Sequence, residues 1–344
     1  ASAHALYAHL GFDGPEIGFD TKSGRLTVKR LADGRLEMDF PAQPPHVVPM
    51  LDELVEAIGA QPRTLTAGPY LMAVFASPEE VIALKPDLAK VNLIAGEATG
   101  GRGNLICAAP AAGWKSGAFD VVSRFFAPGS GIPEDPATGS AHCIIAPYFS
   151  QQLGKAELNC FQAYPGRGAH ITTRMEGDRV KLIGRARTVI EGVEAHSAFH
   201  FQGDRLLGTT TVDAPSGRVV EVPLADPAVE HWVTLVPERD DVVLSLPVLV
   251  GDELLVPTSR AAVDGLERWS LDGRLLGSVD GLGIVSIAGL ATDRATGRVF
   301  VTVSSFESPT AVWRLAEGEL ARWCPPAPPA DALAPLTVSR ATYP

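Results

Sequence analysis

Hydrophobic and polar positions follow two different patterns along the chain, and the change falls near residue 193. Before it, helical and strand-like segments are mixed. Residues 47–59 carry apolar side chains at helical spacing and end at a glycine, which predicts a helix. Ser77 followed by Pro78 predicts the start of another helix, because serine is a good N-cap and proline fits the first helical turn. Strands are predicted at residues 25–31, 35–40, 104–109, 120–126 and 179–190.

After residue 193, short strands follow one another without a convincing helix between them. Turn-forming residues separate them, as at 214–217 and at Asp272-Gly273. Closely spaced antiparallel strands are typical of a sandwich, a barrel or a propeller, and the pattern alone leaves all three open. Residues 324–335 are predicted to be a proline-rich connector. The predicted strands are 205–211, 218–224, 241–250, 253–259, 266–271, 274–279, 298–305 and 311–315.

Composition bounds the class of protein. The 344 residues are 46% hydrophobic and 20% charged, as in a globular protein long enough for two domains. Every lysine lies between Lys22 and Lys181, so composition also changes along the chain. The net charge of −11 argues against general nucleic-acid binding and against an anionic membrane surface. No apolar run reaches membrane-spanning length.

Cysteines and histidines give no metal-site pattern. The four cysteines are scattered without zinc spacing, which predicts reduced thiols in a cytoplasmic protein and no bound metal. His4 and His9 are five residues apart, a spacing that turns two side chains away from each other on a helix. We therefore expect no shared site for these two histidines.

The candidate chemistry lies in residues 131–143, GIPEDPATGSAHC. They follow the predicted strand at 120–126 and lead into an apolar helical segment at 144–153. The first turn of a helix presents unpaired backbone N–H groups and the positive end of the helix dipole. The segment therefore predicts a place for a substrate carboxylate, with Asp135 beside it as a proton-transfer group.

A purely structural interpretation of the same segment stays open. In that interpretation Ser140 or Thr138 caps the helix, Asp135 interacts favourably with its dipole, and Gly139 supplies an unusual backbone angle. Cys143 also has two interpretations, a catalytic thiol or a buried helix residue, and the second is favoured.

GIPEDPATGSAHC, with DVVSRFFAP before it and QQLGKAEL, FQAYPGRG and GDRVKLIGRA after it, closely resembles the phenazine biosynthesis PhzF-like isomerase/epimerase family. The resemblance runs over residues 1–192. It implies an α+β fold with two lobes of the diaminopimelate-epimerase type. Residues 1–45 would be a remnant of the first lobe, which is incomplete, and residues 46–192 the second lobe.

The resemblance also implies the site. Asp135 and Ser140 would be catalytic, and Thr138 and Gly139 would bind a small carboxylated cyclic substrate. The reaction would be a proton shift between carbons, which a carboxylic acid of suitable pKa performs without a cofactor. The family's general acid/base is a glutamate of the first lobe, assisted by a histidine. Both residues would precede Ala1, because the segment that starts at Ala1 resembles the middle of a helix. We therefore expect impaired turnover.

Residues 196–344 resemble part of the amino-terminal β-propeller of prolyl oligopeptidase-type serine peptidases. The resemblance rests on segments 209–227, 235–243, 289–320 and 337–344. It implies that residues 193–344 form an all-β partial propeller. That family's serine-peptidase triad lies in a separate hydrolase domain, and no G-x-S-x-G motif occurs in this sequence.

Three functional hypotheses remain. The first is an isomerase of the PhzF-like class, and the second is a noncatalytic propeller module of a prolyl oligopeptidase-type peptidase. The third is a chimeric fragment without a single function. Because incomplete folds leave sheet edges uncovered, we expect a homodimer or other self-association through those edges. The expected partner is a small carboxylated cyclic substrate, with no nucleic acid and no membrane.

Overall fold

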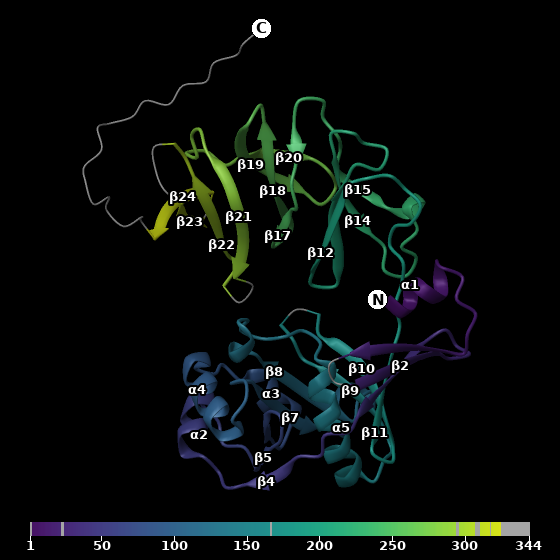
Figure 1. Ribbon diagram of the computed structural model, residues 1–344. Coiled ribbons are helices and arrows are strands. Elements are labelled where there is room, and N and C mark those ends of the chain that lie inside the picture. The colour runs from purple at the N-terminus through teal and green to yellow at the C-terminus, as the bar shows by residue number, and fades with distance from the viewer. Residues whose placement is uncertain are drawn as a thin grey trace. The chain divides into compact units, whose positions relative to one another are not determined.

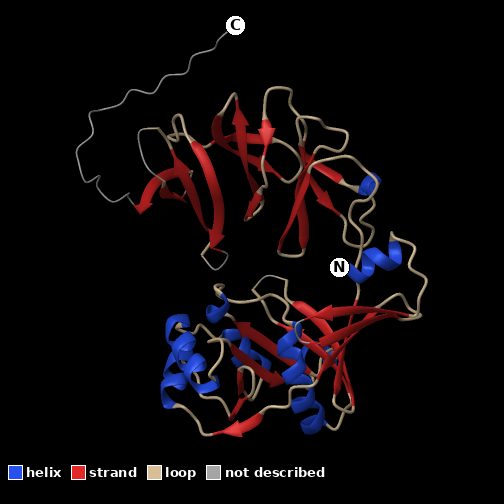
Figure 2. Ribbon diagram, viewed as in Figure 1, coloured by secondary structure: helices blue, strands red, loops and turns tan. Residues whose placement is uncertain are grey.

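The structure is a computed structural model that describes residues 2–21, 24–165, 167–293, 296–306, 310–316 and 318–324. The chain divides into two compact units, Ala1–Arg187 and Thr188–Pro344 (Figure 1). Helices and strands occur together in the first unit, whereas strands dominate the second (Figure 2). The class is therefore mixed α and β. Apart from the backbone of Cys324, the predicted connector at 324–335 lies outside the described residues.

One sheet organises the first unit. Its strands are β1 (Glu16–Thr21), β2 (Gly24–Arg30), β3 (Leu36–Pro41), β4 (His46–Val48), β5 (Thr64–Ala67), β6 (Leu71–Val74), β7 (Leu105–Pro110), β8 (Val121–Phe126), β9 (Glu157–Gln162), β10 (Ala169–Glu176) and β11 (Arg179–Gly184). Their order is β1-β2-β3-β11-β10-β9-β8-β7-β6-β5-β4, which leaves β1 and β4 at the two edges.

The first unit has five described α-helices, and three of them connect the two parallel strand pairs of its sheet. The helices are α1 (Ser2–Ala8), α2 (Asp52–Ile58), α3 (Pro78–Ala83), α4 (Leu88–Thr99) and α5 (Gly139–Leu153). Strand β6 runs parallel to β7, and β8 runs parallel to β9. Parallel neighbours need a long crossover. The pair α3 and α4 supplies the first crossover and α5 supplies the second, so the amino end of α5 comes directly after β8.

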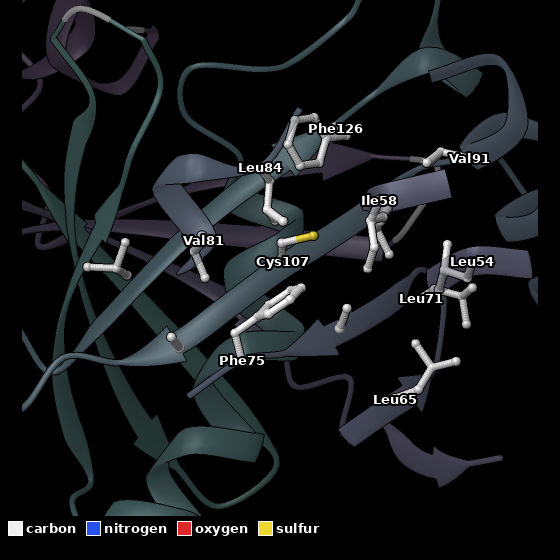
Figure 3. Packing of buried hydrophobic residues seen from close by; sticks show 14 of the residues in the cluster. Leu54, Ile58, Leu65, Leu71, Phe75, Val81, Leu84, Val91, Cys107 and Phe126 are labelled. Atoms are coloured by element: carbon white, nitrogen blue, oxygen red, sulfur yellow. The ribbon is translucent and has the colours of Figure 1, made fainter. Parts of the chain in front are cut away.

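The central strands are buried on both faces. On one face, α2, α3 and α4 cover an apolar cluster, part of which Figure 3 shows. On the other face, α5 packs Ile144, Ile145 and Phe149 against alternate residues of the same strands. Such strands read as continuous apolar runs rather than alternating ones. The labelled members of the first cluster are Leu54, Ile58, Leu65, Leu71, Phe75, Val81, Leu84, Val91, Cys107 and Phe126.

Pro147 in the middle of α5 links this helix to the first part of the chain. A proline cannot donate to the carbonyl four residues before it, here that of Cys143. The backbone N–H of Gln43 donates to that carbonyl instead, at 2.9 Å. Strand β3 also pairs antiparallel with β11. Residues 1–45 and 46–192 therefore contribute strands to one sheet, and their division into two lobes stays a prediction.

Three antiparallel sheets make up the described part of the second unit. The strands are β12 (Ser197–Gln202), β13 (Arg205–Thr210), β14 (Arg218–Val222), β15 (Val233–Val236), β16 (Val243–Leu244), β17 (Val248–Val250), β18 (Glu253–Arg260), β19 (Val263–Ser270), β20 (Leu275–Ser278), β21 (Ser286–Asp293), β22 (Arg298–Ser304), β23 (Ala311–Ala316) and β24 (Glu319–Cys324). The sheets are β12-β13-β14-β15, β16-β18-β19-β20 with β17 also paired to β18, and β21-β22-β23-β24. Four sequential antiparallel strands are the blade pattern of a propeller, and the described residues show no closed ring of such blades.

Apolar side chains join neighbouring sheets of this unit. Leu207 and Val219 of the first sheet cluster with Leu254 and Trp269 of the second. The second and third sheets share another cluster, which includes Val301. In the described part of this unit we find no α-helix, only a 3₁₀ turn at Val229–His231. No helix in the described part of the chain is both long and apolar enough to cross a membrane.

Three predicted elements differ clearly from the observed ones. The strand predicted over 179–190 ends at Gly184. The helix predicted over 47–59 starts only at Asp52, because the β-branched pair before Pro49 extends β4 and pairs with β5. Its end at Gly59, with φ 69°, is as predicted. The strand predicted over 241–250 is interrupted between β16 and β17, around Pro247, which has no N–H for a sheet ladder.

Candidate active site

The GIPEDPATGSAHC segment connects β8 to α5 and forms the first turn of that helix. Helix α5 begins at Gly139, with Thr138 in the N-cap position. The Thr138 side chain makes no capping hydrogen bond, and Ser140 lies inside the helix, so the side-chain capping interpretation is wrong. Gly139 does not have a positive φ, so it supplies no unusual backbone angle. A Cβ at Gly139 would lie 3.2 Å from Cδ1 of Leu182, so close packing favours glycine there.

Asp135 and Thr138 are joined in a small hydrogen-bond network. The Thr138 hydroxyl donates to Oδ2 of Asp135 at 2.6 Å. Gln162, which ends β9 and is 1% exposed, holds both residues. Its Oε1 accepts from the Thr138 N–H at 2.9 Å, and its Nε2 donates to the Asp135 carbonyl at 2.5 Å and to the Thr138 hydroxyl at 3.1 Å. One buried amide thus fixes the backbone and the side chain that orient the Asp135 carboxylate.

His142 supports the same turn from inside the protein. Its side chain is fully buried, and Nδ1 lies 2.8 Å from the Thr138 carbonyl oxygen. Because a carbonyl only accepts, Nδ1 carries the proton and Nε2 keeps a lone pair. That Nε2 is buried, without a hydrogen-bond partner in the described structure. Burial lowers the pKa of His142 from its ordinary 6.5 to about 4, against a smaller opposing effect of the Thr138 hydrogen bond.

An ion pair anchors the loop immediately before Asp135. Arg124 of β8 binds Glu134 with two hydrogen bonds, Nε to Oε1 at 2.8 Å and Nη2 to Oε2 at 2.7 Å. Both side chains are about nine-tenths buried, at 9% and 10% exposure. The remaining nitrogen, Nη1, donates to the carbonyls of Ile82 at 3.2 Å and Leu84 at 2.7 Å, at the end of α3. Every guanidinium nitrogen of the buried Arg124 therefore has a hydrogen-bond partner, and the arginine holds Glu134 in place beside the site.

A close contact between two glycines holds the other end of this loop. A Cβ on Gly129 would lie 2.4 Å from the backbone nitrogen of Gly103, so the two backbones touch where no side chain fits. Next to this contact, the Asn104 amide donates to the Ser130 hydroxyl at 2.8 Å. The loop from β8 to α5 is therefore fixed at both of its ends.

Ser140 lies on the exposed side of the first helical turn. Its hydroxyl lies 3.3 Å from the hydroxyl of Tyr70, a residue between β5 and β6. Asp135 is half-buried, and Pro136 and Ala137 are exposed, so the turn is accessible. A carboxylate, two hydroxyls and the amino end of a helix are thus collected within one turn. This arrangement is able to bind an anion and to hold a carboxyl group ready for proton transfer.

Cys143 lies in the second turn of α5, and His4 and His9 lie in and just after α1. Burial raises the pKa of Cys143 to about 11, and its thiol donates to the Gly139 carbonyl at 3.5 Å, so it is a packed helix residue and not a nucleophile. His4 and His9 were expected to face apart, but their ring centroids lie 5.5 Å from each other, because α1 ends at Ala8. In the described part of the chain, no group of three His, Cys, Asp or Glu residues is arranged to hold a metal.

Sequence reasoning placed Asp135, Thr138, Gly139 and Ser140 on one turn, as observed, and their catalytic and binding roles stay predictions. It missed the residues that build the site from elsewhere in the chain. Three such residues are Tyr70, Arg124 and Gln162, and within the motif it also missed the buried His142. Arg124, Gln162 and His142 had one signal in the sequence, a polar residue inside an otherwise apolar segment, which marks a buried group that needs a partner. Tyr70, in the connection between β5 and β6, had no such signal.

Comparison with known proteins gives two matches. The family model for phenazine biosynthesis-like protein matches residues 1–192. The family model for the prolyl oligopeptidase N-terminal beta-propeller domain matches residues 171–319.

Individual relatives match the first of these two parts. A Pseudomonas aeruginosa protein described as an uncharacterized isomerase is 38% identical over 193 residues, which are 56% of this chain and 69% of that protein. The human phenazine biosynthesis-like domain-containing protein is 34% identical over 206 residues, with the same two coverages. A crystal structure of a PhzF family protein from Enterococcus faecalis is 28% identical, covering 54% of this chain and 67% of that one, with a TM-score of 0.48.

We predict that Glu134→Ala destabilises the first unit by about 3 kcal/mol, because it leaves the Arg124 charge buried without its counterion. The described α-helices all lie before residue 188, so urea unfolding followed by the helical circular dichroism signal reports on this unit. The matched control is Asp20→Ala, which removes the partner of Arg25 in a pair with 66% and 83% exposure and should have a much smaller effect. Equal effects of the two substitutions would contradict the anchoring role of Glu134.

We predict that the burial of neutral His142 makes the free energy of unfolding decrease as the pH is lowered. Its pKa is about 4 in the folded chain and near 6.5 when unfolded, so the unfolded chain takes up the proton first. The stabilisation is complete above pH 6.5 and is lost as the pH falls to about 4, at a cost of about 3 kcal/mol. In His142→Gln the difference in unfolding free energy between pH 7 and pH 4 should be smaller than in wild type by this amount. Parallel curves for the two proteins would show that His142 is not the group responsible.

Proposed function

We propose, because the chain belongs to the phenazine biosynthesis-like protein family through residues 1–192, that it is an isomerase or epimerase acting on a small cyclic carboxylic acid. The observation that carries the proposal is the buried amide of Gln162, which holds Thr138 against the Asp135 carboxylate. A carboxyl group held in one orientation by neutral hydrogen bonds is suited to pass a proton to and from carbon.

In this proposal each residue of the turn has one task. Asp135 takes part in proton transfer, and Thr138 orients it through its hydroxyl. The substrate carboxylate lies at the amino end of α5, where the Ser140 hydroxyl and the backbone N–H of Gly139 donate to it. The proton shift uses a carboxyl group as acid and base, so no cofactor is part of the proposal.

We propose further that residues 1–344, assayed on their own, turn over substrate weakly. The resemblance assigns the general acid/base to a glutamate of a first lobe, and no residue of this sequence matches it. The two-lobe fold of the diaminopimelate-epimerase type belongs to the same proposal, with residues 1–45 and 46–192 as the lobes. We propose the cytoplasm as its compartment, because Cys107, Cys143 and Cys160 are free, buried thiols.

Ligand binding tests the site independently of turnover. We expect benzoate, a carboxylate on a six-membered ring, to shift the backbone amide NMR signals of residues 138–141. Ser140→Ala should weaken binding about tenfold, because a hydrogen bond to a charged group is lost. The matched control is Ser150→Ala near the other end of α5, whose buried hydroxyl has no hydrogen-bond partner in the described structure, so benzoate affinity should not change.

Unchanged amide signals at the highest benzoate concentration would overturn the proposed site. A wild-type chain that isomerises a dihydroaromatic carboxylic acid rapidly on its own would overturn the proposed weakness of turnover, while leaving the binding site in place.

A second candidate function concerns the second unit. The match to a prolyl oligopeptidase N-terminal beta-propeller domain and the three sheets of blade type favour a noncatalytic access or interaction module. Such a module would bind a separate hydrolase domain or a peptide. We also propose that copies of the chain associate through the edges of their sheets, one of which is the edge strand β1.

Size-exclusion chromatography with light scattering tests both parts of this second candidate. We expect the chain alone to have a mass above its monomer value of 36.2 kDa, because edge strands pair with one another. Addition of a prolyl oligopeptidase hydrolase domain should give a further, heavier species. A strict monomer would overturn self-association, and the absence of a mixed complex would overturn the module hypothesis. Failure of both this test and benzoate binding would favour a chimeric fragment without a single function.

A further inference from the structure

Tyr70 reaches the candidate site from a part of the chain that the motif does not include. It is the last residue of the short connection between β5 and β6, and its side chain is half-buried. Its hydroxyl lies 3.3 Å from the Ser140 hydroxyl, although the two residues are 70 positions apart in the sequence. A phenol is therefore presented to the exposed side of the first turn of α5.

The topology of the sheet explains how Tyr70 comes to this place. Strand β6 runs parallel to β7, and β7 runs antiparallel to β8. The beginning of β6 and the end of β8 are therefore at the same end of the sheet. Leu71 pairs with Leu105, which in turn pairs with Phe126. Tyr70 is consequently level with the point where β8 leaves for the site loop.

Packing holds the Tyr70 ring in one orientation. Its ring meets that of Phe125 edge to face, with centroids 5.1 Å apart and an interplanar angle of 69°. Phe125 is itself buried in the cluster beneath α5. Aromatic pairs of this geometry are favourable, and a tyrosine has few rotatable bonds to order. The hydroxyl is thus held in place before any ligand arrives.

The chemistry of the pair selects the group it would bind. Between two hydroxyls, one donates and the other accepts, so one proton remains for another acceptor. When a carboxylate replaces the hydrogen bond between the two hydroxyls, it accepts a hydrogen bond from each of them. The amino end of α5 adds positive potential at the same place. A neutral amide offers one uncharged acceptor oxygen, so its hydrogen bonds with these hydroxyls and its interaction with the helix end are weaker than those of a carboxylate.

We propose that Tyr70 is a substrate-binding residue that donates a hydrogen bond to the substrate carboxylate and selects the acid over its amide. The inference rests on the proposed function, since it concerns the carboxylate placed at Ser140. It adds a contact from the β5–β6 connection, outside the segment to which the site was assigned.

The test compares benzoate with benzamide in wild type and in Tyr70→Phe, by the same amide NMR titration. The substitution keeps the ring on Phe125 and removes only the hydroxyl. We expect the dissociation constant for benzoate to rise about tenfold, since one hydrogen bond to a charged group is lost, with little change for benzamide. The matched control is Tyr148→Phe, on a later turn of α5, where the ring packs on Phe149. This control should leave the dissociation constants of both ligands unchanged.

The outcomes separate this inference from the function on which it rests. If wild type does not bind benzoate, the proposed site is wrong, and the inference falls with it. If wild type binds benzoate and Tyr70→Phe binds it equally well, the inference alone is overturned. Equal losses for benzoate and benzamide would also overturn it, because they would show a change of shape and not a lost donor to the carboxylate.

Discussion

The site depends on one constraint, that a polar loop must cross the end of an apolar sheet without leaving buried charge unpaired. Arg124 meets this requirement, because its guanidinium has a carboxylate on one side and the carbonyls that end α3 on the other. The bidentate bond to Glu134 places the next residue, Asp135, relative to β8. An isolated charge in this position would be strongly unfavourable, so loop and strand are held together. The position of the proposed proton-transfer group therefore follows from satisfying a buried arginine.

The two sides of the turn differ in how firmly they are held. On the inner side, Gln162 and His142 are buried and hold Thr138 through neutral hydrogen bonds. Through Thr138, these neutral partners fix the orientation of the Asp135 carboxylate. On the outer side, Ser140 and Tyr70 are accessible and share one weak hydrogen bond at 3.3 Å. A rigid inner side and an open outer side suit the separate tasks of orienting a carboxyl group and receiving a ligand.

Local signals allowed much of the fold to be predicted, whereas the contacts that build the site arise between distant segments. The helix start at Ser77 and the helix end at Gly59 could be predicted, because capping and positive φ depend on a few neighbouring residues. The motif residues share one turn because they are adjacent in sequence. Gln162 and Tyr70 join that turn only because the strand order brings β9 and β6 near β8, and strand order is a property of the whole sheet. Strand order cannot be predicted from a short stretch of one sequence, because it depends on pairing between segments far apart in the chain.

Strand pairing also decides which unit contains the candidate site. The propeller-type match begins at residue 171, inside β10, yet β10 pairs with β9 and β11 pairs with β3. If those two strands belonged to the second unit, β9 would lose a neighbour just where Gln162 holds the turn. Leu182 of β11 would also no longer pack under Gly139, whose missing side chain makes room for it. Hydrogen bonding and packing therefore require β10 and β11 in the first unit. The physical boundary lies after β11, and the residues of the candidate site fall together on one side of it.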